Sequence, residues 1–222
     1  MHDSRLTRRI LIAALAVFCV LPSSLAIAQA RGLSGVSLPQ VVNVNGKDLA
    51  LNGSAIARDR VVFEVYVIGL YLETKTSDAL TAIKIDQTKR IVITMLRSVS
   101  RRMFVDAVEK RVTRNSTPEE MPGLRLRLDT LEEALPDLKK GDILDFTYLP
   151  GAGTLVRRQG QELAIPGKDF AEALFSAWLG REPDSRALKR DLLGLGVTPA
   201  SCCESLPNSP PRGAAEISPN RR

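Results

Sequence analysis

A run of β-branched and aromatic residues between positions 58 and 73 constrains the fold of this chain most. It reads RDRVVFEVYVIGLYLE. Such side chains lose rotamer freedom in a helix and pack well on a pleated sheet. We therefore predict one long strand over residues 58–73. A strand that begins at a fixed cation, Arg58, would suit the floor of a binding cleft.

Strict alternation along this strand would place Val65 and Val67 on one face and Tyr66 and Ile68 on the other. Just before it, Asn52-Gly53-Ser54 has the composition of a turn. Further upstream, Asn45-Gly46 separates two alternating runs, which is a strong hairpin signal because both residues tolerate positive φ.

The rest of the chain alternates between groups of strands and groups of helices. We predict further strands over 89–97, 143–149, 154–158 and 162–165. We predict helices that begin after Asp78, at Ser100 and near Asp184, and two more over 124–135 and 168–179. Helices grouped against an antiparallel sheet define an α+β domain.

The ends of the chain have different compositions from its middle. Residues 1–30 have a basic head, an apolar run and two small-x-small cleavage candidates, which end at Ala28 and Ala30. They are typical of a signal peptide, so we expect a periplasmic protein with no stable membrane span after cleavage. Residues 31–40 are a Gly/Ser/Pro lead-in, 41–194 the domain, and 195–222 a tail without periodicity that we predict to be disordered.

Two absences exclude several classes of site. The only histidine of the sequence, His2, belongs to the predicted signal peptide. The exported chain then has no Ser-His or Cys-His pair and no histidine metal ligand. Gly151-Ala152-Gly153 links two predicted strands and is not a phosphate loop. We expect no cofactor and no metal.

The remaining cysteines and the charge give little evidence of a site. Cys202 and Cys203 are adjacent in the tail, where they could form a vicinal or intermolecular disulfide or have no role in a site. Loss of residues 1–30 lowers the formal net charge from +6 to +4. This mild, scattered charge does not indicate nucleic-acid binding.

Several segments, taken in order, resemble the chalcone isomerase-like family, in particular its secreted bacterial branch. They are Asn52-Gly53, Arg58, residues 65–72, Lys140-Gly141-Asp142, residues 148–154, and residues 170–180 with Pro183 and Leu188-Lys189. The resemblance covers about residues 40–194. It implies an open-faced β-sandwich, in which a large antiparallel sheet carries one layer of helices with a ligand cleft between them.

The resemblance also implies a role for Arg58. In the plant enzymes, which cyclise chalcones to flavanones, the matching arginine would stabilise a developing enolate. In the fatty-acid-binding relatives it would hold a carboxylate. Arg58 is thus the candidate catalytic residue if the protein is an enzyme, and Arg58, Tyr66 and Arg97 are the candidate ligand-binding residues.

This sequence departs from the plant enzymes at their other catalytic positions. Tyr66 stands where they have a threonine. The predicted helix over 100–115 has no tyrosine and no asparagine before Asn115, and Ala177 replaces a Ser/Thr. The basic residues of the predicted helix over 100–115 have the pattern of a solvent-exposed face.

Three functions follow, in order of preference. The first is non-catalytic binding of a small apolar carboxylate such as a fatty acid. The second is a chalcone-type isomerase acting on a phenolic ligand. The third is an envelope scaffold whose tail contacts a partner. The sequence determines neither the ligand nor the oligomeric state.

Overall fold

Seven strands form one antiparallel sheet in the computed structural model, which describes residues 31–59, 63–183 and 185–196. Their order in the sheet is their order in the chain, so each strand pairs with the next. They are β3 (Val41–Val44), β4 (Lys47–Asp59), β5 (Phe63–Leu72), β6 (Lys89–Met95), β7 (Ile143–Leu149), β8 (Gly153–Arg158) and β9 (Gln161–Ile165).

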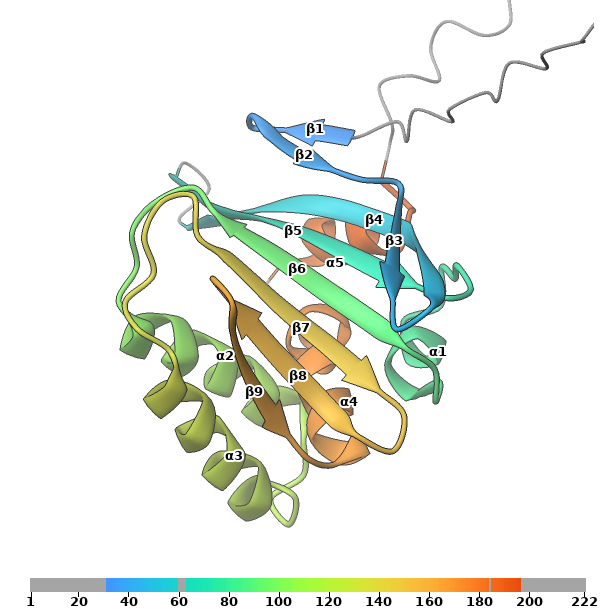
Figure 1. The fold of residues 1–222 in the computed structure, drawn as a ribbon. Helices are drawn as coiled ribbons and strands as arrows, with labels where there is room; N and C mark the ends of the chain where they lie inside the picture. The colour runs from blue at the N-terminus through green and yellow to red at the C-terminus, as the bar shows by residue number, and fades with distance from the viewer. Residues whose placement is uncertain (1–30, 60–62, 184, 197–222) are drawn as a thin grey trace, which may run out of the picture.

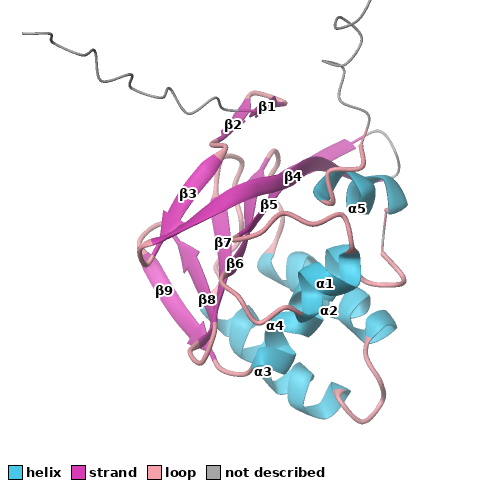
Figure 2. Ribbon diagram, turned by 90° about the vertical axis from the view of Figure 1, so that its right-hand side faces the viewer, coloured by secondary structure: helices cyan, strands magenta, loops and turns pink. Residues whose placement is uncertain are grey.

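The helices cover one face of this sheet (Figure 2). They are α1 (Ala79–Lys84), α2 (Arg101–Asn115), α3 (Met121–Ala134), α4 (Lys168–Leu179) and α5 (Arg186–Leu192). The side chains of Asp78, Ser100 and Ser185 accept hydrogen bonds from the first turns of α1, α2 and α5, as N-caps do. The α+β class and the layered architecture are confirmed.

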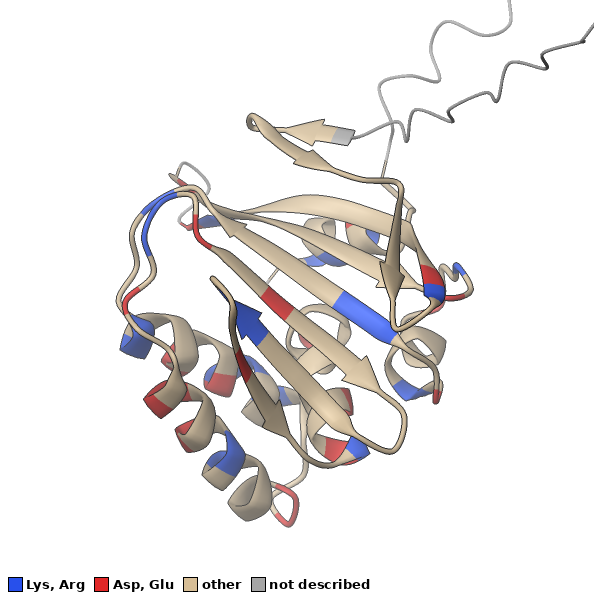
Figure 3. Cartoon of the chain, in the orientation of Figure 1, with Lys and Arg blue, Asp and Glu red and all other residues tan. Residues whose placement is uncertain are grey.

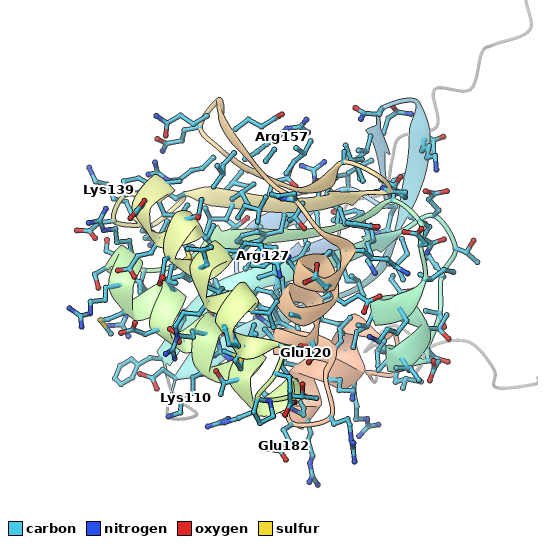
Figure 4. All side chains as sticks on the ribbon, turned by 90° about the horizontal axis from the view of Figure 1, so that it is seen from below. Lys110, Glu120, Arg127, Lys139, Arg157 and Glu182 are labelled. Carbon is cyan, nitrogen blue, oxygen red and sulfur yellow. The ribbon has the colours of Figure 1, made fainter. Side chains whose placement is uncertain are left out.

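The core lies between the sheet and α4. The inward side chains of β5 are Tyr66, Ile68, Leu70 and Leu72, all buried. From Phe170 to Leu179, α4 is buried at nearly every position, so it is the central helix of the layer. Arg127 of α3, labelled in Figure 4, donates to both carboxylate oxygens of Asp169 at the start of α4, at 2.9 and 2.5 Å.

The opposite face of the sheet is partly covered by a small hairpin, β1 (Arg31–Leu33) and β2 (Val36–Leu38), drawn above the sheet in Figure 1. Leu38 of this hairpin packs with Leu51, Val67 and Tyr71 in a second apolar cluster. The Gly/Ser/Pro segment over 31–40 is therefore an ordered part of the fold.

A row of charges crosses the uncovered part of this face (Figure 3). Arg90 of β6 pairs with Asp145 of β7, and Arg157 of β8 pairs with Glu162 of β9. Asp145 and Arg157 are cross-strand neighbours. Opposite charges on neighbouring strands pair with one another here. This face is therefore polar and does not need helices to cover it.

The prediction of one strand over 58–73 is wrong. Arg58 lies at the end of β4, and β5 begins at Phe63. The two strands are antiparallel neighbours, with Asp59 opposite Phe63. Composition could not locate this connection, because β-branched residues continue across it. The residues of the connection itself, 60–62, are among those not described.

The predicted turn at Asn52-Gly53 is also wrong, because both residues lie inside β4 at a register shift. A Cβ on Gly53 would lie 2.1 Å from the carbonyl oxygen of Asp191 and 2.5 Å from that of Leu192. The Asn52 side chain donates to the Leu192 and Thr76 carbonyls, at 2.8 and 3.0 Å. This pair of residues therefore holds the end of α5 against the sheet.

Asn45-Gly46 forms the predicted hairpin turn between β3 and β4, with φ of 50° and 80°. The predicted signal peptide and most of the predicted tail, including Cys202 and Cys203, lie outside the described residues. Within the described part of the chain, no helix is long and apolar enough to cross a membrane.

Candidate functional site

A cleft of about 440 Å³ opens at one end of the sheet. Its walls are the ends of β4 and β5, the segment that follows β6, one side of α2, and parts of α4 and α5. Ligand sites for small molecules typically measure about 300–1,000 Å³. The cleft is thus large enough for a small ligand.

The inner end of the cleft is aromatic and apolar. Trp178 of α4 donates its indole N–H to the Tyr66 hydroxyl, with Nε1 2.9 Å from Oη. Both side chains are buried. Phe104, Ala177 and Leu188 complete this apolar wall. The predicted core position of Trp178 is confirmed, and its ring also lines the cleft.

A β-bulge orients two consecutive residues of β5 toward the cleft. Ala57 pairs with Tyr66, whereas Arg58 pairs with Glu64, so Val65 has no partner in β4. An extra residue interrupts the alternation of a strand. Val65 and Tyr66 therefore both line the cleft, while Val67 belongs to the cluster on the opposite face. The expectation that Val65 and Val67 share a face is wrong for this reason.

The mouth of the cleft is basic. Its lining includes five cations, Arg58, Arg97, Lys110, Arg111 and Arg114, and one carboxylate among the described residues, Asp59. Three of the cations come from α2, on the helical stripe 103, 107, 110, 111 and 114. Positions three or four apart lie on the same side of a helix, so this spacing in the sequence could have revealed that side.

Arg58 lies at this mouth and already has a partner. Its Nη2 is 2.9 Å from Glu64 Oε1, and about half of the Arg58 side chain is exposed. Ser34 of the β1–β2 turn donates to the other oxygen of Glu64 at 2.7 Å. The hydrogen bonds from Ser34 and from Arg58 hold the pKa of Glu64 below its usual range.

Arg97 follows β6 and is exposed. Its guanidinium carbon lies 5.9 Å from the centre of the Phe63 ring, within the range of a cation–π contact. The structure thus brings Arg58, Tyr66 and Arg97 to one cleft. It leaves Arg101 and Arg102 outside the lining, and it places Asn115 elsewhere, where its side-chain oxygen accepts from the Glu182 amide at 2.9 Å.

A second hollow, of about 660 Å³, lies near the β1–β2 hairpin and the end of α5. Asn52, which lines it, makes the structural bonds already described, and no aromatic side chain is in its lining. The described residues also contain no group of three or more potential metal ligands. We therefore assign the candidate site to the first cleft.

The sequence of residues 30–194 matches the family model described as chalcone isomerase-like. The chain belongs to the chalcone isomerase-like family. No curated protein matches it. Among solved structures, this chalcone isomerase-like protein is similar to a fatty-acid binding protein of Arabidopsis thaliana, with 13% identity and a TM-score of 0.60. The match covers 74% of this chain and 96% of the plant chain, and at this identity it shows a shared fold.

The cleft of this chalcone isomerase-like protein therefore has two chemically different ends. Apolar and aromatic side chains form the inner wall, and cations surround the opening. Such a cavity favours a ligand with an apolar body and an anionic end, because each end meets groups of matching chemistry.

Proposed function

We propose that this protein binds a small apolar carboxylate, such as a fatty acid, without transforming it. The observation that carries the proposal is the polarity of the cleft, with the Tyr66–Trp178 pair inside and Arg58 among the cations at the mouth. The acyl chain would contact the aromatic wall, and the carboxylate would bind Arg58. The fatty-acid binding named for the Arabidopsis structure supports this assignment.

The pairing of Arg58 with Glu64 is compatible with this role. Both side chains are partly exposed, and exposed pairs are weak. A ligand carboxylate can therefore replace Glu64 at little cost. The remaining cations of the mouth, Arg97 and Lys110 among them, add favourable potential for an anion at the same opening.

Palmitate titration tests the proposal, because Trp178 is the only tryptophan of the sequence and lies in the cleft wall. Bound palmitate should change its fluorescence. Arg58→Gln should weaken binding about tenfold to a hundredfold, the value of a charge-assisted hydrogen bond. Arg157→Gln is the matched control, since Arg157 is also half exposed and paired with a glutamate, but lies outside the cleft.

The ester and a chalcone complete the test. Methyl palmitate, which has no carboxylate, should bind the native protein and Arg58→Gln equally. Equal palmitate affinity of Arg58→Gln and Arg157→Gln would overturn the proposal. So would loss of chalcone absorbance faster than in buffer together with no palmitate binding, because that result indicates an isomerase.

We further propose that the protein acts in the periplasm, on the basis of the signal-like composition of residues 1–30. Cell fractionation with N-terminal sequencing tests this. The mature protein should begin just after Ala28 or Ala30, and recovery of the uncleaved chain from the cytoplasm would contradict it.

A further inference from the structure

We propose that the mouth of the cleft is a docking surface for anionic phospholipid membranes. The surface, here called the rim, consists of Phe63, Met103, Arg58, Arg97 and Lys110. Phe63 is 59% exposed and Met103 67% exposed. The purpose of such docking, the loading of an acyl ligand into the cleft, rests on the proposed function. Membrane binding by the rim can be tested without that ligand.

The two apolar side chains of the rim lie on separate elements, β5 and α2, which both contribute residues to the cleft lining. Phe63 begins β5, opposite Asp59, and Met103 lies in the first turn of α2 and lines the cleft. The other large hydrophobic side chains that are exposed in the described residues are Val41, Leu80, Leu126, Ile143 and Leu195. None of these lines the cleft, whereas Met103 lines it and Phe63 contacts Arg97, which also lines it.

The cations of the rim accompany these apolar side chains. Arg97 lies over the Phe63 ring, and Lys110 projects from α2 at the margin of the molecule (Figure 4). Among the described residues, Asp59 and Glu64 are the strand partners of Phe63 and Arg58. Beside Met103, the exposed pair of Arg102 and Asp106 adds no net charge. Among the described residues, the cleft lining has five basic side chains and one acidic side chain, and two of the five, Arg111 and Arg114, have interaction partners of their own.

Exposed apolar side chains bordered by arginine and lysine have the composition of an interfacial membrane site. Apolar side chains enter the boundary between headgroups and acyl chains, while cations remain at the phosphates. Each cation near an anionic leaflet strengthens binding about fivefold. An acyl chain that leaves the bilayer at the rim would enter the cleft without crossing water.

Sedimentation with vesicles tests the rim, using ligand-free protein and phosphatidylcholine vesicles with or without phosphatidylglycerol. We expect binding only when phosphatidylglycerol is present, and weakening as salt rises from about 0.1 to about 1 M, where the screening length falls from about 10 to about 3 Å. Binding that is equal on both vesicle types would overturn the proposal.

Two pairs of variants separate the contributions. Phe63→Ser with Met103→Ser should reduce binding at least about tenfold, whereas Leu80→Ser with Leu126→Ser removes equally exposed side chains elsewhere and should not. Arg97→Gln with Lys110→Gln should reduce binding about fivefold per cation. Lys47→Gln with Lys75→Gln, at the other end of the sheet, removes the same charge and should change little.

The same variants are titrated with palmitate in the absence of vesicles, after thermal melts show that they fold. Protein that binds palmitate but no vesicles, or rim variants that bind vesicles as the control variants do, would overturn the docking surface alone. Rim-dependent vesicle binding without palmitate binding would support the docking surface and overturn the proposed function.

Discussion

Arg58 donates to Glu64 across the β4–β5 pair, with Nη2 2.9 Å from Oε1. The proposed ligand-binding cation therefore has an internal carboxylate partner that is not itself part of the cleft lining. Because Glu64 also accepts from Ser34, this pair links the N-terminal hairpin to the mouth of the site.

Glu64→Gln should increase the affinity for palmitate about twofold to fivefold, because Arg58 no longer exchanges a charged partner for the ligand. Fluorescence titration of Trp178 measures the change. Glu162→Gln, which frees Arg157 outside the cleft, is the control and should leave affinity unchanged. An affinity that falls in Glu64→Gln would show that Glu64 positions Arg58 for the ligand instead of competing with it.

Tyr66→Phe should lower the free energy of unfolding by about 1–3 kcal/mol, because the buried indole N–H of Trp178 loses its acceptor. Urea denaturation of Tyr66→Phe, Trp178→Phe and the double variant checks this. The double variant should cost less than the sum of the single variants, since it removes both partners. Strict additivity would argue against an energetic role of the hydrogen bond.

Gly53→Ala should destabilise the protein by about 1–3 kcal/mol, the usual cost of overpacking, because its Cβ would meet the Asp191 and Leu192 carbonyls. Palmitate binding should weaken too, since Leu188 of the displaced α5 lines the cleft. Gly32→Ala is the control, as a Cβ there meets nothing within 4 Å. Equal melting temperatures for the two variants would contradict the close contact.

Lys89→Met should change how stability depends on pH. Lys89 is fully buried and donates to the carbonyls of Ala82, Ile83 and Ile85 at the end of α1. Burial lowers its pKa to about 8, and the charges of Glu172, Lys168, Asp86 and Lys84 modify this value. Between pH 8 and the usual value of 10.5, the unfolded chain therefore binds more protons than the folded protein.

The contribution of Lys89 to the free energy of unfolding must then rise as the pH increases from about 8 towards 10.5. Below pH 8 Lys89 is charged in the folded protein, and this buried charge is destabilising. Urea denaturation at a series of pH values compares the native protein with Lys89→Met. The difference between the two unfolding free energies should move in favour of the native protein as pH rises. Burial raises the pKa of Tyr71 and of Tyr148 to about 12. Both tyrosines are present in the native protein and in Lys89→Met, so their effect on the pH dependence largely cancels when the two unfolding free energies are subtracted. A difference that stays constant with pH would contradict the lowered pKa of Lys89.

The sequence by itself determined the class of this fold and most of its elements. Alternation and β-branched composition locate the strands, and polar caps such as Asp78 and Ser100 locate helix starts, because these signals are local. The cleft arginine was found through the resemblance to the family. Arg58 lies in β4 and not at the start of β5 because of where the chain turns between these two strands. The uniform composition of 58–73 contains no signal for the position of that turn.

Only the tertiary structure decided how the cleft is built. The bulge at Val65 turns two consecutive side chains inward, and the pairings of Trp178 with Tyr66 and of Arg58 with Glu64 join residues 112 and 6 positions apart. The cleft also takes its basic side from α2, whose charges resembled a solvated face in the sequence. Contacts between distant segments depend on strand register and helix placement, and the packing of the whole chain sets both.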